Sequence, residues 1–122
     1  MIFSFEKLDV WQESRALVKD IYAIIRKFPS EERYALSDQI KRAVISIPSN
    51  IAEGSGRSSC KEKIHFFEFS YASLMEVLSQ LDVAMDLGYI TEEEFNNFEV
   101  LSDKECRLLS GLTRYFQKLS NP

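Results

Sequence analysis

The sequence predicts an all-α protein, an antiparallel up-down-up-down four-helix bundle. Apolar residues recur with helical period in four long segments, and the connections between these segments are short. The 122 residues also include only 4 glycines and 3 prolines, whereas the many turns of a β-sandwich or barrel would require more of both. Because no linker, repeat or low-complexity stretch divides the chain, we expect one domain over residues 1–122.

The first helix is expected over residues 8–28. Its apolar side chains gather into one broad arc when the chain turns by about 100° per residue. Phe28 precedes Pro29, and the residue before a proline disfavours the helical region of backbone space. The first helix should therefore end at Phe28.

The second helix is expected over residues 34–53, where apolar residues keep a 4-3-1-3-4 spacing between Leu36 and Ile51. Pro48 lies inside this pattern and removes one backbone hydrogen bond. Because the apolar stripe resumes in phase at Ile51, the sequence predicts a Pro-kinked second helix, not an end. Gly54 and Gly56 should then adopt the left-handed conformations that close a helix.

Capping boxes mark the starts of the last two helices. The third begins after Ser59, with Glu62 three residues later, and stops at Gly88. The fourth opens with Thr91 and Glu94 and runs to about residue 119. The predicted core stripe of the third helix is Ile64, Phe67, Tyr71, Leu74, Leu78, Leu81 and Met85; that of the fourth is Phe95, Phe98, Leu101, Leu108, Leu112, Tyr115 and Leu119.

Several apolar residues fall outside these stripes. Phe66, Phe69 and Val77 point away from the predicted core of the third helix, and Ile45 points away from that of the second. A set of such residues on adjacent helices predicts an exposed apolar patch, and large patches mark interfaces. We therefore expect a homo-oligomer with these four residues at the interface; the alternative is a core wider than the helical wheel suggests.

A basic cluster is the remaining candidate site. It comprises Lys41, Arg42, Arg57, Lys61 and Lys63, on the second helix and at the start of the third. Such a face could hold the phosphates of a nucleic acid. The alternative is solvated surface charge, with Glu53 paired to Arg57 one helical turn away.

The sequence predicts no catalytic, cofactor or metal site. The run from Glu62 to His65 has the E-x-x-H spacing of di-iron bundles, but that site needs two such pairs and the chain has one histidine. Arg57 and His65 can be weighed as a ribonuclease pair, but the seven residues between them make the spacing too long for such a site. No serine, cysteine or lysine has a base and an orienting group at recognisable spacing.

Charge and hydropathy restrict the partners. No apolar run approaches the roughly 20 residues that span a bilayer, so no membrane contact is expected. The first residues lack a basic leader with an apolar core, so we expect a cytoplasmic protein with Cys60 and Cys106 as reduced thiols. The net charge is −4, with 11 basic against 9 acidic residues over 1–63 and 4 against 10 over 64–122. This acidic balance argues against strong nonspecific binding of nucleic acid.

Three stretches of the chain resemble a known family: KLDVWQESRALVKDIY, FPSEERYALSDQIKRAVISIPSNIAEGSGR and SYASLMEVLSQLDVAMDLGYI. They are similar to the four-helix-bundle proteins encoded in intervening sequences of bacterial 23S rRNA genes, over about residues 5–115. The most specific part is QIKRAVISIPSNIAEGSGR. Family members usually have arginine where this chain has Lys41. The lysine keeps the positive charge, but it is less suited than arginine to contact a phosphate through two parallel hydrogen bonds.

This resemblance implies a bundle that assembles into a homopentameric ring and a link to ribosomal RNA genes. Accessory proteins of diversity-generating retroelements are also similar; these are basic pentamers that bind a reverse transcriptase and nucleic acid. Five copies of a chain with net charge −4 would carry about −20, which sets this chain apart from them.

The combined prediction is a non-enzymatic homo-oligomer that acts as a scaffold or binding protein. Its expected partners are copies of itself, with RNA or a nucleic-acid-binding protein as further candidates. Two alternatives stay open. One is an RNA-processing enzyme that uses Arg57 and His65, and the other is a purely structural oligomer that binds no nucleic acid.

Overall fold

The computed structural model describes residues 3–120, and all regular structure in that range is helical. Two short 3₁₀ helices, η1 (Ser4–Lys7) and η2 (Ser30–Glu32), accompany four α-helices within the described residues. Both α1 and α3 pack against α2 and α4. The fold is therefore the predicted four-helix bundle. Its α-helices are α1 (Asp9–Ile25), α2 (Leu36–Ser55), α3 (Cys60–Asp86) and α4 (Glu92–Ser120).

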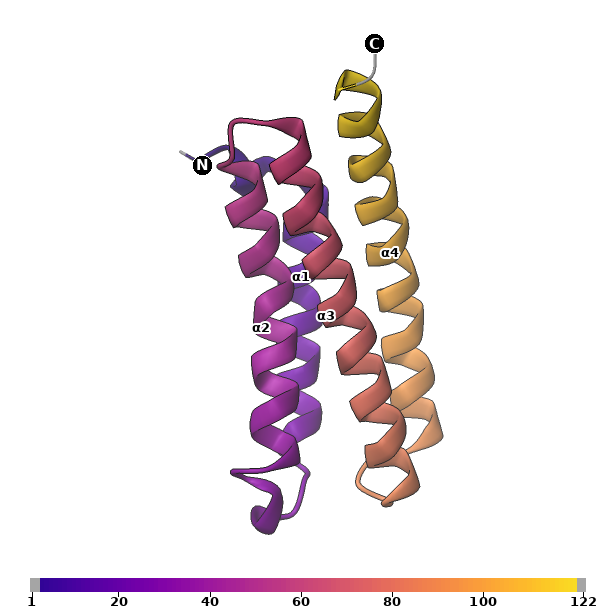
Figure 1. Cartoon of the computed structure of the whole chain (residues 1–122). Coiled ribbons are helices and arrows are strands. Elements are labelled where there is room, and N and C mark those ends of the chain that lie inside the picture. Colours follow the sequence, from indigo (N-terminus) through magenta and orange to yellow (C-terminus); the bar gives the residue numbers. More distant parts are fainter. Residues whose placement is uncertain (1–2, 121–122) are drawn as a thin grey trace.

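The connections alternate between the two ends of the bundle. Figure 1 shows the α1–α2 and α3–α4 connections at one end and the α2–α3 connection at the other, so consecutive helices run in opposite directions. The η1 turn lies near the α2–α3 end, where the hydroxyls of Ser4 and Ser55 are 3.3 Å apart. Pro48 lies within α2, which continues to Ser55; the predicted kink at Pro48 stays a prediction.

The apolar stripe of α2 forms the centre of the core, as its spacing predicts. Ile40, Val44, Ile47 and Ile51 are 0% exposed. From α1, Leu17 and Ile21 are buried against them in the same cluster. Burying each such side chain contributes about 1.5–3 kcal/mol to the free energy of unfolding, so this shared core is the main source of the bundle's stability.

Glycine has two different roles in the connections. Among the glycines of residues 3–120, only Gly88 has a positive φ, of 79°, and it ends α3 as predicted. The expectation of left-handed conformations at Gly54 and Gly56 is wrong. Gly54 lies inside α2, where an added Cβ would come within 2.9 Å of Phe66 Cβ and of Phe67 Cε1. Glycine is needed there because α2 and α3 approach closely, not because the backbone turns.

The buried stripe of α3 differs from the predicted one. Val77 and Ala84 are 0% exposed, whereas Tyr71, which was assigned to the core, is 41% exposed. The buried residues are Phe67, Ser70, Leu74, Val77, Leu81 and Ala84. Ser70 explains the difference, because its buried hydroxyl donates to the Ile47 carbonyl of α2 at 2.9 Å and so lies on the core side. A stripe defined by apolar residues alone could not include it.

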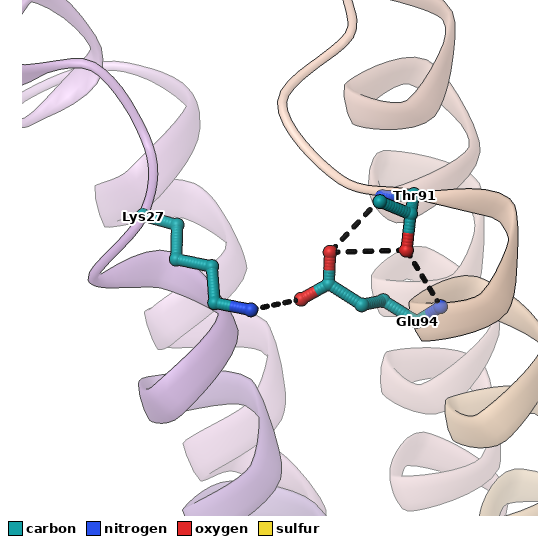
Figure 2. A network of polar contacts seen from close by, with 3 residues as sticks. All are labelled: Lys27, Thr91 and Glu94. Carbon is teal, nitrogen blue, oxygen red and sulfur yellow. Dashed lines mark hydrogen bonds and ion pairs between the residues drawn. The ribbon is translucent and has the colours of Figure 1, made fainter.

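The predicted capping box at the start of α4 is confirmed and also joins two helices. Thr91 Oγ1 accepts from the Glu94 amide at 3.1 Å, and Glu94 Oε1 accepts from the Thr91 amide at 3.0 Å. Lys27, just beyond the end of α1, donates to Glu94 Oε2 at 2.7 Å (Figure 2). The hydrogen bond from Lys27, followed by that from the Thr91 amide, lowers the pKa of Glu94 below its ordinary value. This contact fixes the start of α4 beside the end of α1.

The core of α4 is also narrower than its apolar residues predict. Leu109 is 1% exposed, whereas Tyr115 and Leu119 are 57% and 53% exposed and so do not belong to the core. The buried residues of α4 are Phe95, Phe98, Ser102, Glu105 and Leu109. Within residues 3–120, no helix combines the length and apolar character needed to cross a bilayer.

Candidate interaction surface

The structure does not gather the five predicted basic side chains into one face. Lys41 points toward α1, with its Nζ 5.4 Å from the centre of the Tyr22 ring. Arg42 is paired with Asp38 on its own helix, Nε to Oδ2 at 3.0 Å. At about 1.5 Å per residue, roughly 24 Å separate Lys41 from Arg57 along α2. The predicted nucleic-acid face is therefore divided between the two ends of the bundle.

Arg57 and Lys63 lie at the α2–α3 end and are held by internal contacts. Arg57 contacts Glu53 at 3.6 Å and Glu62 at 3.8 Å, so the predicted pairing with Glu53 is confirmed. Lys63 donates to the Ser55 carbonyl at 2.9 Å, which satisfies one of the free acceptors at the end of α2. These contacts occupy two of the charges that an RNA phosphate would need.

An aromatic cluster, defined here as His65, Phe66 and Phe69, lies beside Arg57. The rings of His65 and Phe69 are 4.3 Å apart and those of Phe66 and Phe69 are 6.1 Å apart, all with edge-on geometry. The Arg57 guanidinium is 4.6 Å from the centre of the Phe66 ring. Such aromatic contacts with arginine are characteristic of the best-packed parts of protein interfaces.

A surface cavity of about 770 Å³ lies next to this cluster. Arg57, Lys61, His65 and Phe66 line it from the α3 side, and Gln117 lines it from α4. Helical spacing predicts part of the aromatic cluster, because His65 and Phe69 are one turn apart. The contact of Arg57 with Phe66 depends on the path of the connection and has no signal in the spacing.

Beyond the aromatic cluster, the outer side of α3 exposes further apolar side chains among acidic ones. Phe69 is 46%, Met75 37% and Val83 47% exposed, and Ile45 of α2 is 42% exposed. Phe66 is half-buried. Of the four residues assigned to an interface, these positions place Ile45, Phe66 and Phe69 at the surface. Val77 is fully buried in the core, so its assignment to an exposed interface is wrong.

Glu105 is a buried acid that the apolar pattern of the sequence does not reveal. It is 0% exposed, and neither carboxyl oxygen has a hydrogen-bond partner among the described residues. Burial, followed by the nearby negative charge of Glu13, raises the pKa of Glu105 to about 8. Its position three residues after Ser102 and four before Leu109, on the buried stripe, was the available signal.

The remaining reactive groups are dispersed. Cys60 and Cys106 are both free thiols and half-buried, and burial raises the pKa of Cys106. Residues 3–120 contain no group of three or more His, Cys, Asp or Glu side chains arranged to hold a metal ion. His65 contacts two phenylalanine rings, and no hydrogen bond joins it to Arg57 in this part of the chain.

Comparisons with known proteins agree with this architecture. The sequence matches the family of 23S rRNA-intervening sequence proteins over residues 6–111. A solved structure from Bacteroides thetaiotaomicron, a protein with unknown function from the S23 ribosomal protein family, is similar with a TM-score of 0.78. That similarity covers 86% of this chain and 95% of the other at 23% identity, and so supports the fold. No curated protein matches the chain.

Proposed function

This chain belongs to the family of 23S rRNA-intervening sequence proteins, and we propose that it is a non-enzymatic scaffold that assembles with copies of itself. The observation that carries the proposal is the two-sided character of α3. Its inner side is buried in the bundle, and its outer side exposes the aromatic cluster together with Met75 and Val83. Exposed aromatic and aliphatic side chains that gather on one side of a helix commonly mark an interface.

A second copy of the chain is the occupant that this surface fits best. Large aromatic side chains and arginine at a desolvated centre, with charged residues around them, are the usual composition of such contacts. The aromatic cluster with Arg57 supplies the centre, and Glu53 and Glu62 lie at its edge. Closed rings of identical chains are a common form of assembly, and the sequence resemblance described above implies five copies.

The alternative functions have less support from the geometry. RNA binding at the predicted basic face would have to displace the internal contacts of Arg42, Arg57 and Lys63. An RNA-processing enzyme that uses Arg57 and His65 would need the two side chains to act together, and within the described residues no hydrogen bond joins them, since His65 contacts Phe69 and Arg57 contacts Phe66.

Replacing Phe69 with glutamate tests the proposal. We expect the wild-type chain to sediment at a multiple of its 14.1 kDa mass at micromolar concentration. Phe69→Glu should sediment as a monomer, because truncating a central interface residue typically weakens association by about 2 kcal/mol or more, roughly thirtyfold.

Val100→Glu is the matched control for this experiment. Val100 is 72% exposed on α4, so the same change of charge is made outside the proposed interface. We expect Val100→Glu to assemble like the wild type. A monomeric wild type, or equal dissociation of both variants, would contradict the proposal.

A further inference from the structure

A second cavity, of about 240 Å³, lies at the opposite end of the bundle, where the chain turns from α1 to α2. Its polar lining consists of Arg26, Arg33, Lys41, Ser30 and Ser37. Tyr22 and Phe28 contribute apolar surface, and no acidic residue lines it. Three cations around one small cavity repel one another, so this arrangement needs an explanation.

The three cations have no carboxylate partner within residues 3–120. The ion pairs of this range use other basic residues: Lys27, Arg42, Arg57, Lys104 and Arg107. Nearby Glu32 accepts from the Leu36 amide at 3.2 Å and from the Tyr89 hydroxyl at 3.3 Å, and Asp38 pairs with Arg42. The three cations at the cavity therefore have no direct ion-pair partner, although the acidic residues Glu31 and Glu32 lie close to them in the sequence.

An aromatic ring of the cavity lining contacts one of these cations. Lys41 Nζ is 5.4 Å from the centre of the Tyr22 ring. A cation on an aromatic face keeps its N–H groups free to donate to another acceptor. The Arg33 guanidinium is also 5.4 Å from the centre of the Tyr34 ring, but this contact is exposed and does not fix the side chain.

Ser37 adds a hydroxyl group to the cationic lining of the cavity. The residue is only 4% exposed, and it lines the cavity together with Arg33 and Lys41. A serine hydroxyl can donate to an anion that enters the cavity. Ser37 also lies in the first turn of α2, whose N-cap residue Ala35 supplies no side-chain cap.

Charge and shape identify the class of ligand. We propose that this cavity binds a phosphate group, with Arg26, Arg33 and Lys41 as its cationic contacts and Ser37 as a hydroxyl donor. Guanidinium groups match phosphate oxygens in pairs, and the start of α2 adds the positive end of a helix dipole. Because α1 ends at the same cavity, its carbonyls partly offset that dipole, so the side chains contribute most of the attraction.

This site is separate from the proposed assembly surface. Only Lys41 belongs to the basic face predicted from the sequence, and Arg26 and Arg33 were not part of it. The phosphate could come from free phosphate or from a nucleotide, and Tyr34 offers a way to distinguish these sources. Tyr34 is 85% exposed beside Arg33, where a nucleobase could stack on its ring.

Calorimetric titration of the full chain with inorganic phosphate, pyrophosphate, adenosine monophosphate and adenosine tests the proposal. We expect saturable binding of at least one phosphate compound and none of adenosine. Arg33→Gln should weaken binding at least about tenfold, as expected for a charge-assisted hydrogen bond. Ser37→Ala should weaken it by about threefold to tenfold, as expected for a neutral one.

Lys19→Gln is the matched control, because Lys19 is an exposed lysine of α1 outside the cavity and its loss changes the net charge equally. It should bind like the wild type, and circular dichroism should confirm that every variant is folded. If a nucleotide is the ligand, Tyr34→Ala should weaken the binding of adenosine monophosphate at least about fivefold, because the stacking contact is lost. If free phosphate is the ligand, Tyr34→Ala should leave the binding of inorganic phosphate unaffected. No saturable binding of any phosphate compound, or equal loss in Arg33→Gln and Lys19→Gln, would overturn the proposal.

Discussion

At the scale of single residues, Glu105 has the least usual environment. A carboxyl group buried without a hydrogen-bond partner is much more stable in its neutral form, because ionisation in an apolar interior has a large desolvation cost. The raised pKa, about 8, means that Glu105 is mostly protonated at neutral pH in the folded bundle. In the unfolded chain the same group would ionise near its ordinary value of 4.5.

This difference predicts a loss of stability with rising pH. Glu105 opposes folding least below about pH 4.5, and its penalty grows as the pH rises toward 8 and then levels off. The free energy of unfolding should fall by roughly 3 to 5 kcal/mol over that interval relative to a chain without the group. Urea titrations of the wild type and of Glu105→Gln at a series of pH values measure this difference.

Glu105→Gln is nearly isosteric and does not ionise, so subtracting its profile removes the contributions of all other titrating groups. The difference between the two profiles should appear between about pH 4.5 and 8. Parallel profiles across this range would show that Glu105 is already paired or hydrated in the folded protein.

At the scale of helices, the contact between α2 and α3 depends on Gly54. An added methyl group would lie 2.9 Å from Phe66 Cβ and 3.2 Å from the Lys63 carbonyl, neither of which is the flexible end of a side chain. The two helices would have to move apart, and such overpacking typically costs about 1–3 kcal/mol. The gain in helix propensity, about 1 kcal/mol, offsets only part of this.

Gly54→Ala should therefore destabilise the bundle, by about 1–2 kcal/mol in chemical denaturation. Gly111→Ala is the matched comparison, because Gly111 lies within α4 and nothing comes within 4 Å of an added Cβ there. That change should stabilise the protein by about 0.5–1 kcal/mol. If Gly54→Ala raised the free energy of unfolding as Gly111→Ala does, the gain in helix propensity would outweigh the cost of the close approach of α2 and α3.

The helices themselves could be predicted from the sequence to within a few residues, because their signals are local. Spacing and capping residues determine where α2, α3 and α4 begin, and these depend on neighbours three or four positions away. The rotation of α3 could not be predicted in the same way. Apolar residues cover a broad arc of that helix, and the buried hydrogen bond from Ser70 to Ile47 shows which part of the arc faces α2.

Only part of the candidate interaction surface can be predicted from the sequence, because only part of it depends on local helical spacing. Surface positions for Ile45 and Phe69 follow from helical geometry, whereas the burial of Val77 follows from the rotation of α3. The contact of Arg57 with Phe66 and the cavity around Arg33 depend on how the connections fold between helices. Such contacts join residues whose distance in the sequence carries no periodic signal.

At the scale of the whole molecule, self-assembly would couple stability to concentration. A folded state that associates is favoured by mass action, so its melting temperature rises with protein concentration. For a chain of this length we expect about 3 to 5 °C for each tenfold increase in concentration. Calorimetric scans over two orders of magnitude in concentration would measure the slope.

Phe69→Glu should melt at the same temperature at every concentration, because a monomer has no association equilibrium to shift. Its melting temperature should match that of the wild type only in dilute solution. A wild type with no concentration dependence would contradict assembly in the folded state, whatever its mass in the ultracentrifuge.

The buried hydrogen bond of Ser70 also bears on which alignments of α2 and α3 are possible. The buried residues of α3 recur at alternating intervals of three and four, so a slide of seven residues would again present apolar side chains to α2. That alternative would bury the Ser70 hydroxyl away from the Ile47 carbonyl and would separate Gly54 from Phe66 and Phe67, which it contacts in the native alignment. A single buried serine thus penalises the shifted alignment, at a position where an alanine would fit either one.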